Sequence, residues 1–196
     1  MKVQAKNILV YLHYKIKGIL LNNTILKKAL FLDRDGIINI DHGYTYKIED
    51  FEFVEDIFNF IKAYSDAGYI IFIVTNQSGI GRGYYTKQDF KHLTTWMLNI
   101  FKSKQIHIEN VYFCPHSPEE NCHCRKPNIG MMEQALSAYD IDLTNSWLVG
   151  DKQSDIDFAI HANIGNRIAI GGEDTFTGYT HRFTSISEAL SHLPTL

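Results

Sequence analysis

Short apolar runs recur along this chain, and polar clusters follow them. Residues 29–32, Ala-Leu-Phe-Leu, are apolar throughout, as is typical of a strand buried on both faces. Similar runs predict further strands at residues 69–74, 111–113, 147–149 and 167–170. Because such strands leave no polar face, we expect helices to cover both sides of their sheet.

The segments between these strands show helical spacing of apolar residues. Gly68 marks the end of the first predicted helix, and Thr86 is the expected N-cap of the second. The inward positions are Ile57, Phe60, Ile61 and Tyr64, then Phe90, Leu93, Met97 and Ile100, then Met132, Ala135, Leu136 and Tyr139, and finally Ile156, Ala159 and Ile160. The alternation predicts an α/β fold, a Rossmann-like doubly wound parallel sheet.

Length and charge limit the class of protein. The 196 residues suit one domain, which we place at residues 28–196, with residues 1–27 as an N-terminal extension of unassigned structure. The net charge of -3 gives no general attraction to nucleic acid or anionic membranes. No apolar stretch approaches the roughly 20 residues of a membrane span, and Lys15 and Lys17 interrupt the apolar clusters where a secretory signal would lie. We expect a cytoplasmic monomer that acts on a small molecule, without a nucleic-acid or membrane partner.

Carboxylates follow two of the predicted strands. Asp33 and Asp35 come directly after the first strand, and Gly36 is next. Residues i and i+2 of a strand point to the same side, so both carboxylates are aimed at the edge where open α/β sheets place their ligands. Asp151 follows the fourth strand, and the three together predict an oxygen cage for Mg²⁺, although a surface turn is an alternative for the first pair. Asp155 lies one helical turn further on, where it either supports Asp151 or faces solvent.

Polar and cationic residues at the same edge add a site for an anion. Residues 75–78, Thr-Asn-Gln-Ser, offer hydroxyls and amides at the end of the second strand. Three glycines between residues 79 and 83 permit close approach of the backbone. Arg125 and Lys126 contribute two cations. Metal-binding and anion-binding groups together favour phosphate chemistry.

All three cysteines of the chain lie within the loop at residues 114–124. The expected ligands of a closed tetrahedral Zn²⁺ site are Cys114, His116, Cys122 and Cys124. His123 is a competing ligand, and a redox-active pair of Cys122 and Cys124 is the alternative to zinc. The odd number of cysteines argues against a complete disulfide framework and for a reducing compartment. Because no position stays open, the zinc would be structural and would order the loop before Arg125.

In this order, the motifs resemble the haloacid dehalogenase superfamily of phosphatases. The matching residues are Asp33-Arg34-Asp35-Gly36-Ile37, Thr75, Lys126, and Gly150-Asp151 with Asp155. The resemblance covers roughly residues 28–171, and Ile37 stands where many members carry Thr. It implies the fold of that superfamily without a separate cap domain, because the segment after the first strand is short.

The resemblance also implies a covalent mechanism. Asp33 would attack the phosphorus, and Asp35 would protonate the leaving oxygen and then deprotonate the hydrolytic water. Mg²⁺ would be held by Asp33, the backbone carbonyl of Asp35, and Asp151. Thr75 and Lys126 would bind the oxygens of the transferred phosphoryl group.

The zinc loop resembles the branch that contains heptose-bisphosphate and histidinol-phosphate phosphatases. The segments at residues 41–44 and 75–83 match the heptose-bisphosphate phosphatases more closely. The substrate contacts implied are Asp41, His42, Gly43, Tyr44, Thr75, Asn76, Gln77, Ser78, Arg125, Lys126 and Lys152. The implied reaction removes the 7-phosphate of D-glycero-D-manno-heptose 1,7-bisphosphate, on the route to nucleotide-activated heptose for lipopolysaccharide core or related glycans. Histidinol phosphate is the alternative substrate. An alternative of another class is a zinc-loop protein that binds a partner and has an inactive sheet edge.

Overall fold

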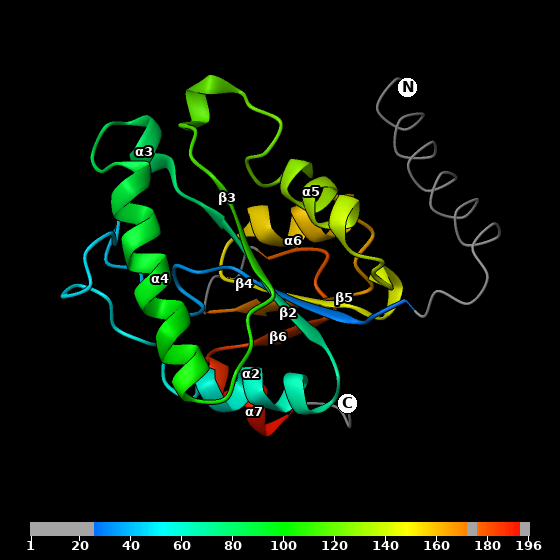
Figure 1. Ribbon diagram of the computed structural model, residues 1–196. Coiled ribbons are helices and arrows are strands. Elements are labelled where there is room, and N and C mark those ends of the chain that lie inside the picture. The colour runs from blue at the N-terminus through cyan, green and yellow to red at the C-terminus, as the bar shows by residue number, and fades with distance from the viewer. Residues whose placement is uncertain (1–25, 172–175, 193–196) are drawn as a thin grey trace, which may run out of the picture.

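All strands of the sheet run parallel, in the order β3-β2-β1-β4-β5-β6 (Figure 1). The computed structural model describes residues 26–171 and 176–192. Its strands are β1 (Ala29–Leu32), β2 (Ile70–Asn76), β3 (Asn110–Cys114), β4 (Trp147–Gly150), β5 (Asn166–Ile170) and β6 (His181–Phe183). The predicted α/β fold with a doubly wound parallel sheet is confirmed.

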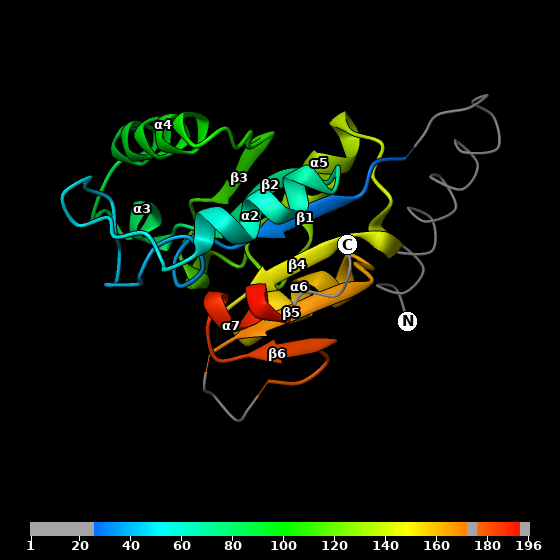
Figure 2. The ribbon, with the colours of Figure 1, turned by 90° about the horizontal axis from the view of Figure 1, so that it is seen from below.

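Side chains of the central strand alternate between two apolar layers. Leu30 and Leu32 belong to the layer under α2, α4 and α7, whereas Ala29 and Phe31 belong to the layer under α5 and α6. The helices are α2 (Ile57–Asp66), α3 (Ser78–Gly81), α4 (Lys87–Ser103), α5 (Gly130–Ala138), α6 (Gln153–His161) and α7 (Ile186–Ser191). In Figure 2, α2 and α7 lie in front of the sheet, and α5 and α6 lie behind it. Burial on both sides explains why the strand is apolar at every position.

Two residues that were predicted to face inward from helices do not. In α4 the fully buried residue is Phe101, and Ile100 is only half-buried. In α6 the buried residue is Phe158, whereas Ile160 is 41% exposed. In each helix the neighbouring aromatic ring occupies the inward face, which the spacing alone does not distinguish from a flanking apolar position.

The loop between β1 and α2, residues 33–56, folds back on itself through short bridges from Asn39 to Asp35 and Phe53. It is the segment in which a cap would be inserted, and the described residues contain no separate cap domain. Before β1, Lys27 forms a parallel bridge with Ile141. The rest of the expected extension, residues 1–25, lies outside the described residues. Within the described part of the chain, no helix is both long and apolar enough to cross a bilayer.

The N-cap of α4 predicts a measurable effect on stability. Asp89 donates its backbone N–H to the Thr86 hydroxyl at 3.1 Å and accepts the backbone N–H of Thr86 at 2.8 Å. Thr86→Ala should therefore lower the free energy of unfolding by about 1 kcal/mol in urea titrations. Thr95, exposed in the middle of α4, is the control, because its hydroxyl donates only to the Lys91 carbonyl. Thr95→Ala should change stability by less than about 0.5 kcal/mol, and equal losses in both variants would contradict the capping role.

Candidate active site and metal sites

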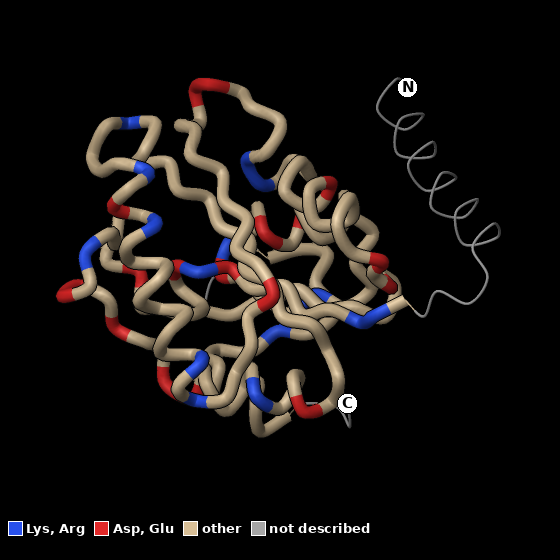
Figure 3. Tube along the Cα trace, in the orientation of Figure 1, with Lys and Arg blue, Asp and Glu red and all other residues tan. Residues whose placement is uncertain are grey.

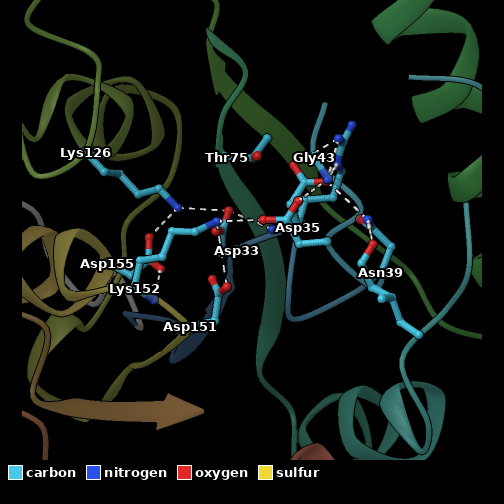
Figure 4. A network of polar contacts seen from close by, with 12 residues as sticks. Asp33, Asp35, Asn39, Gly43, Thr75, Lys126, Asp151, Lys152 and Asp155 are labelled. Atoms are coloured by element: carbon cyan, nitrogen blue, oxygen red, sulfur yellow. Dashed lines mark hydrogen bonds and ion pairs between the residues drawn. The ribbon is translucent and has the colours of Figure 1, made fainter. Parts of the chain in front are cut away.

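The carboxyl ends of β1, β2 and β4 lie side by side and carry the central site residues. Asp33 directly follows β1, Thr75 is the residue before the end of β2, and Asp151 directly follows β4. Lys126 comes from the loop between β3 and α5 and reaches the same edge (Figure 4). Figure 3 shows acidic and basic residues close together in this region. The structure thus brings together residues that are far apart in the sequence.

Lys126 is the buried cation of this edge. Its ammonium group donates to Asp33 Oδ1 at 2.9 Å, to Asp155 Oδ1 at 2.7 Å and to the Val74 carbonyl at 2.8 Å. Burial would lower the pKa of Lys126, but the charges of Asp155 and Asp33 outweigh burial and raise it. Burial raises the pKa of Asp33, and Lys126 acts against that rise. All three protons of the ammonium group are engaged, so its position is fixed.

Asp155 is 1% exposed, which excludes the alternative that it faces solvent. Besides its pair with Lys126, it accepts the backbone N–H of Lys152 at 3.0 Å, at the start of α6. Gly150 leaves the space that Asp155 needs, because a Cβ at Gly150 would lie 2.2 Å from that of Asp155. Asp155 therefore anchors both lysines from beneath the site.

Carboxylate oxygens of Asp33, Asp151 and Asp155 lie within 4.8 Å of one another. Asp151 Oδ1 is buried without a hydrogen-bond partner, and burial followed by the charge of Asp33 raises the pKa of Asp151 to about 7. Gly36 makes room for this side chain, because a Cβ there would lie 2.2 Å from Asp151 Oδ2. An unpartnered carboxylate oxygen among like charges suits a hard divalent cation, so the donor set fits Mg²⁺.

The carboxylate of Asp35 has other partners. Arg34 donates to its Oδ1 at 2.7 Å and to its Oδ2 at 2.9 Å, and Asn39 and Gln77 add bonds at 3.1 Å and 2.8 Å. β1 ends at Leu32, so the strand geometry that would align the side chains of residues 33 and 35 no longer applies. The side chain of Asp35 consequently lies outside the acidic cluster.

Arg34 is a residue that sequence reasoning missed. It is 1% exposed, and besides Asp35 it donates to the Thr45 carbonyl at 2.8 Å. Its guanidinium carbon lies 5.7 Å from the centre of the Phe90 ring. The sequence did offer a signal for this role, since Arg34 stands between two aspartates and is followed closely by two isoleucines, Ile37 and Ile38. A buried arginine requires a carboxylate partner, and its two neighbours provide one.

The expected polar residues at the end of β2 lie at the site, but two of their side chains are used within the protein. Asn76 accepts the backbone N–H of Lys126 at 3.0 Å and donates to its carbonyl at 3.2 Å. Gln77 bonds Asp35 and Thr75 through its amide nitrogen. Ser78 begins α3. Asn76 therefore locks the backbone of Lys126 to the sheet.

The segment 41–44 forms the outer wall. Asp41 accepts a bond from the Lys152 ammonium group at 3.0 Å and one from the backbone of Gly43 at 2.9 Å. His42 lies 3.7 Å from Glu52, and the 45% exposed Tyr44 packs edge-on against another tyrosine ring. The lining of the open pocket here consists of residues 42–46, residues 49–52 and Tyr84. Lys152 and segment 41–44 thus close one side of the site.

The cysteines and one histidine converge in the loop after β3. The Sγ atoms of Cys114, Cys122 and Cys124 are 3.0–3.6 Å apart, and His116 Nδ1 lies 3.2 Å from Cys124 and 3.5 Å from Cys114. No disulfide joins these cysteines, and Zn–S bonds of about 2.3 Å correspond to tetrahedral edges of about 3.8 Å. His123 points away and pairs with Glu133 at 2.7 Å. The donor set therefore fits a four-coordinate Zn²⁺.

The loop 114–124 packs on α3, and Arg125 follows it, half-buried, with an unpartnered Nη1. Gly81 donates its backbone N–H to the Pro115 carbonyl at 2.8 Å, and Arg82 pairs with Glu119 at 3.2 Å. A Cβ at Gly81 would lie 2.6 Å from the backbone nitrogen of Ser117. This glycine therefore serves the contact with the cysteine loop.

Known proteins with similar sequences decide the family. Residues 29–175 match the family described as polynucleotide kinase 3 phosphatase. The D-glycero-alpha-D-manno-heptose-1,7-bisphosphate 7-phosphatase of Campylobacter jejuni is 45% identical over 164 residues, covering 84% of this chain and 94% of the relative. The D-glycero-beta-D-manno-heptose-1,7-bisphosphate 7-phosphatase of Helicobacter pylori is 47% identical over 144 residues, covering 73% of this chain and 83% of the relative. This chain belongs to the heptose-bisphosphate phosphatase family of the haloacid dehalogenase superfamily.

Solved structures agree with this family assignment. The D,D-heptose 1,7-bisphosphate phosphatase of B. bronchiseptica, complexed with magnesium and phosphate, has a TM-score of 0.74 and 25% identity, covering 85% of this chain and 97% of that chain. A putative phosphatase of this superfamily from Mesorhizobium loti has a TM-score of 0.73 and 27% identity. The match covers 87% of this chain and 89% of that chain. As a member of this family, the chain is a phosphoric monoester hydrolase.

The buried and exposed lysines of this site should differ in their effect on stability. Lys126→Met leaves the carboxylates of Asp33 and Asp155 buried without their cation. The free energy of unfolding, measured by urea titration in the presence of a chelator, should fall by about 3–5 kcal/mol. Lys152→Met is the control, because the Lys152 side chain is 53% exposed and its pair with Asp41 is screened by water. We expect a change below about 1 kcal/mol for the control. Similar losses in both variants would contradict a special role of burial.

Proposed function

We propose that this enzyme hydrolyses the 7-phosphate of D-glycero-D-manno-heptose 1,7-bisphosphate. The observation that carries the proposal is the chain of charges from Asp33 through Lys126 to Asp155, beside the unpartnered oxygen of Asp151. It offers a carboxylate nucleophile, a fixed cation and a place for a second cation, which are the groups that phosphoryl transfer needs. The names of its relatives supply the choice of substrate.

In the proposed reaction, a carboxylate oxygen of Asp33 bonds to phosphorus while the bond from phosphorus to the substrate oxygen breaks. Asp35 gives a proton to that leaving oxygen. A water molecule then attacks the phosphorus, Asp35 takes its proton, and the bond from phosphorus to Asp33 breaks. The products are heptose 1-phosphate and inorganic phosphate, and both carboxyl groups return to their starting states.

The cation of the proposed site is Mg²⁺, held by Asp33, Asp151 and the backbone carbonyl of Asp35. When bound, it supplies positive charge that offsets the repulsion between a carboxylate and a phosphate. Zn²⁺ is proposed at the cysteine loop, on the ligands Cys114, His116, Cys122 and Cys124. The unpartnered oxygen of Asp151 supports the first proposal, and the close sulfur contacts support the second.

Lys126 and Thr75 are proposed to bind the phosphoryl oxygens. Transfer of the phosphoryl group removes the negative charge of Asp33. The N–H of Lys126 that donates a hydrogen bond to Asp33 then becomes available to those oxygens. The outer groups proposed to contact the sugar or its second phosphate are Asp41, His42, Gly43, Tyr44, Ser78, Arg125 and Lys152. The unpartnered Nη1 of Arg125 is suited to a phosphate oxygen.

The product retains its anomeric phosphate, which is the group that a nucleotidyl transfer would require. We therefore place the reaction before nucleotide activation of the heptose for lipopolysaccharide core or related glycans. The supply of nucleotides and the three free cysteines favour the cytoplasm. A monomer suffices for this reaction, because the groups proposed for catalysis all belong to one chain.

A substrate panel tests the proposed function directly. Phosphate release should be fastest, by kcat/KM, for one or both anomers of the heptose 1,7-bisphosphate, with histidinol phosphate slower. Asp33→Asn should abolish turnover because the amide cannot act as the nucleophile, while circular dichroism shows an unchanged fold. A preference for histidinol phosphate would overturn the substrate, and an active Asp33→Asn variant would overturn the covalent mechanism.

The proposed zinc site predicts a contrast between two histidines. Elemental analysis should find about one zinc per chain in the purified protein. His116→Ala should lose this zinc during dialysis against a chelator, whereas His123→Ala should keep it, because His123 pairs with Glu133 outside the cluster. Zinc that survives in His116→Ala and is lost from His123→Ala would reverse the assignment.

A further inference from the structure

The side-chain amide of Gln77 connects the proposed acid–base residue to the proposed phosphate-binding hydroxyl. Its Nε2 lies 2.8 Å from Asp35 Oδ2 and 2.8 Å from Thr75 Oγ1. Its Oε1 lies 2.6 Å from the hydroxyl of Tyr85. Gln77 is 2% exposed, and both ends of its amide are occupied by protein groups.

The chemistry of the partners fixes the orientation of this amide. Asp35 Oδ2 accepts a hydrogen bond from Arg34 at 2.9 Å, so it acts as an acceptor and the group of Gln77 that faces it is the NH₂. The carbonyl oxygen of Gln77 then faces Tyr85, which must donate. Burial raises the pKa of Tyr85 to about 12, so its hydroxyl keeps the proton at neutral pH.

Tyr85 is itself held in place by packing. It is 6% exposed, and its ring stacks on that of Tyr46 with centroids 5.1 Å apart. Gly79 admits the ring, because a Cβ at Gly79 would lie 2.1 Å from Tyr85 Cε1. This glycine therefore makes room for a tyrosine, where the sequence suggested an approach of the backbone to a phosphate.

We propose that Gln77, oriented by Tyr85, is a positioning residue that aims the Asp35 carboxyl group at the leaving oxygen of the substrate. The proposal rests on the proposed function, in which Asp35 protonates that oxygen. The side-chain nitrogen of Gln77 also donates a hydrogen bond to the Thr75 hydroxyl oxygen. The hydroxyl proton of Thr75 is therefore directed to a different acceptor. Gln77 thus acts through Asp35 and Thr75, without contact to the substrate.

The chemistry of the leaving group separates this role from a general effect on structure. A sugar alkoxide is a poor leaving group and needs the proton from Asp35, whereas 4-nitrophenolate leaves without it. The parameter kcat/KM reports on the steps up to departure of the leaving group, so later hydrolysis of the intermediate does not enter. A displaced acid should therefore slow the sugar substrate selectively.

The test compares Tyr85→Phe and Gln77→Met with the wild type on heptose 1,7-bisphosphate and on 4-nitrophenyl phosphate. For both variants, kcat/KM should fall about tenfold or more with the sugar substrate and less than about threefold with the aryl substrate. Tyr64→Phe is the matched control, because the Tyr64 hydroxyl is buried without a partner in the apolar layer of α2. It should leave both values unchanged.

Equal losses with the two substrates, or no loss with either, would overturn the positioning role. If Gln77→Met does not fold by circular dichroism, Tyr85→Phe decides, since it removes one oxygen and keeps the stacked ring. A failure of the proposed function would be seen separately, in the wild-type enzyme. Its kcat/KM would then be higher for another alkyl phosphate of the substrate panel than for the heptose bisphosphate. That alkyl phosphate then replaces the heptose in the comparison.

Discussion

The buried ammonium group of Lys126 is the interaction on which the site depends. It lies between Asp33 and Asp155, with Asp151 close by. Charges taken out of water are tolerated only when they are paired, and here one fixed cation faces three carboxylates. Burial, together with the remaining negative charge, raises the pKa of Asp151, and the same charge makes the cluster suitable for a divalent ion. The same excess of carboxylates over lysine therefore determines both the stability of the site and its affinity for a cation.

Lys126 itself needs support, because the loop that carries it has little apolar core. Asn76 bonds the backbone of Lys126 on both sides, and the cysteine cluster lies directly before it in the chain. Gly81 fastens the same loop to α3. The cysteine cluster and polar bonds thus take the place that hydrophobic packing has under the sheet. A long loop can then present a charged residue within tight geometric limits.

Sequence patterns predicted the parts of the fold that depend on local apolarity. The five predicted strands all exist, because each is an apolar run between buried layers. The sixth, β6, escaped prediction because His181–Phe183 is half-buried at every position and carries no apolar run. Periodicity also could not anticipate the Gln77 network, since the contact with Asp35 spans 42 residues and exists only after folding. The approach of Asp151 to Gly36 is likewise a product of the sheet order.

The separation of Asp33 from Asp35 gives the site its division of labour. A regular strand would have pointed both carboxylates to one side, and they would have competed for the same cation. Because the strand ends before Asp33, that residue faces Lys126 and the acidic cluster, whereas Asp35 turns toward Arg34, Asn39 and Gln77. Two identical groups, two positions apart, thereby receive different partners. Such a difference in surroundings is the physical condition for one to serve as nucleophile and the other to transfer protons.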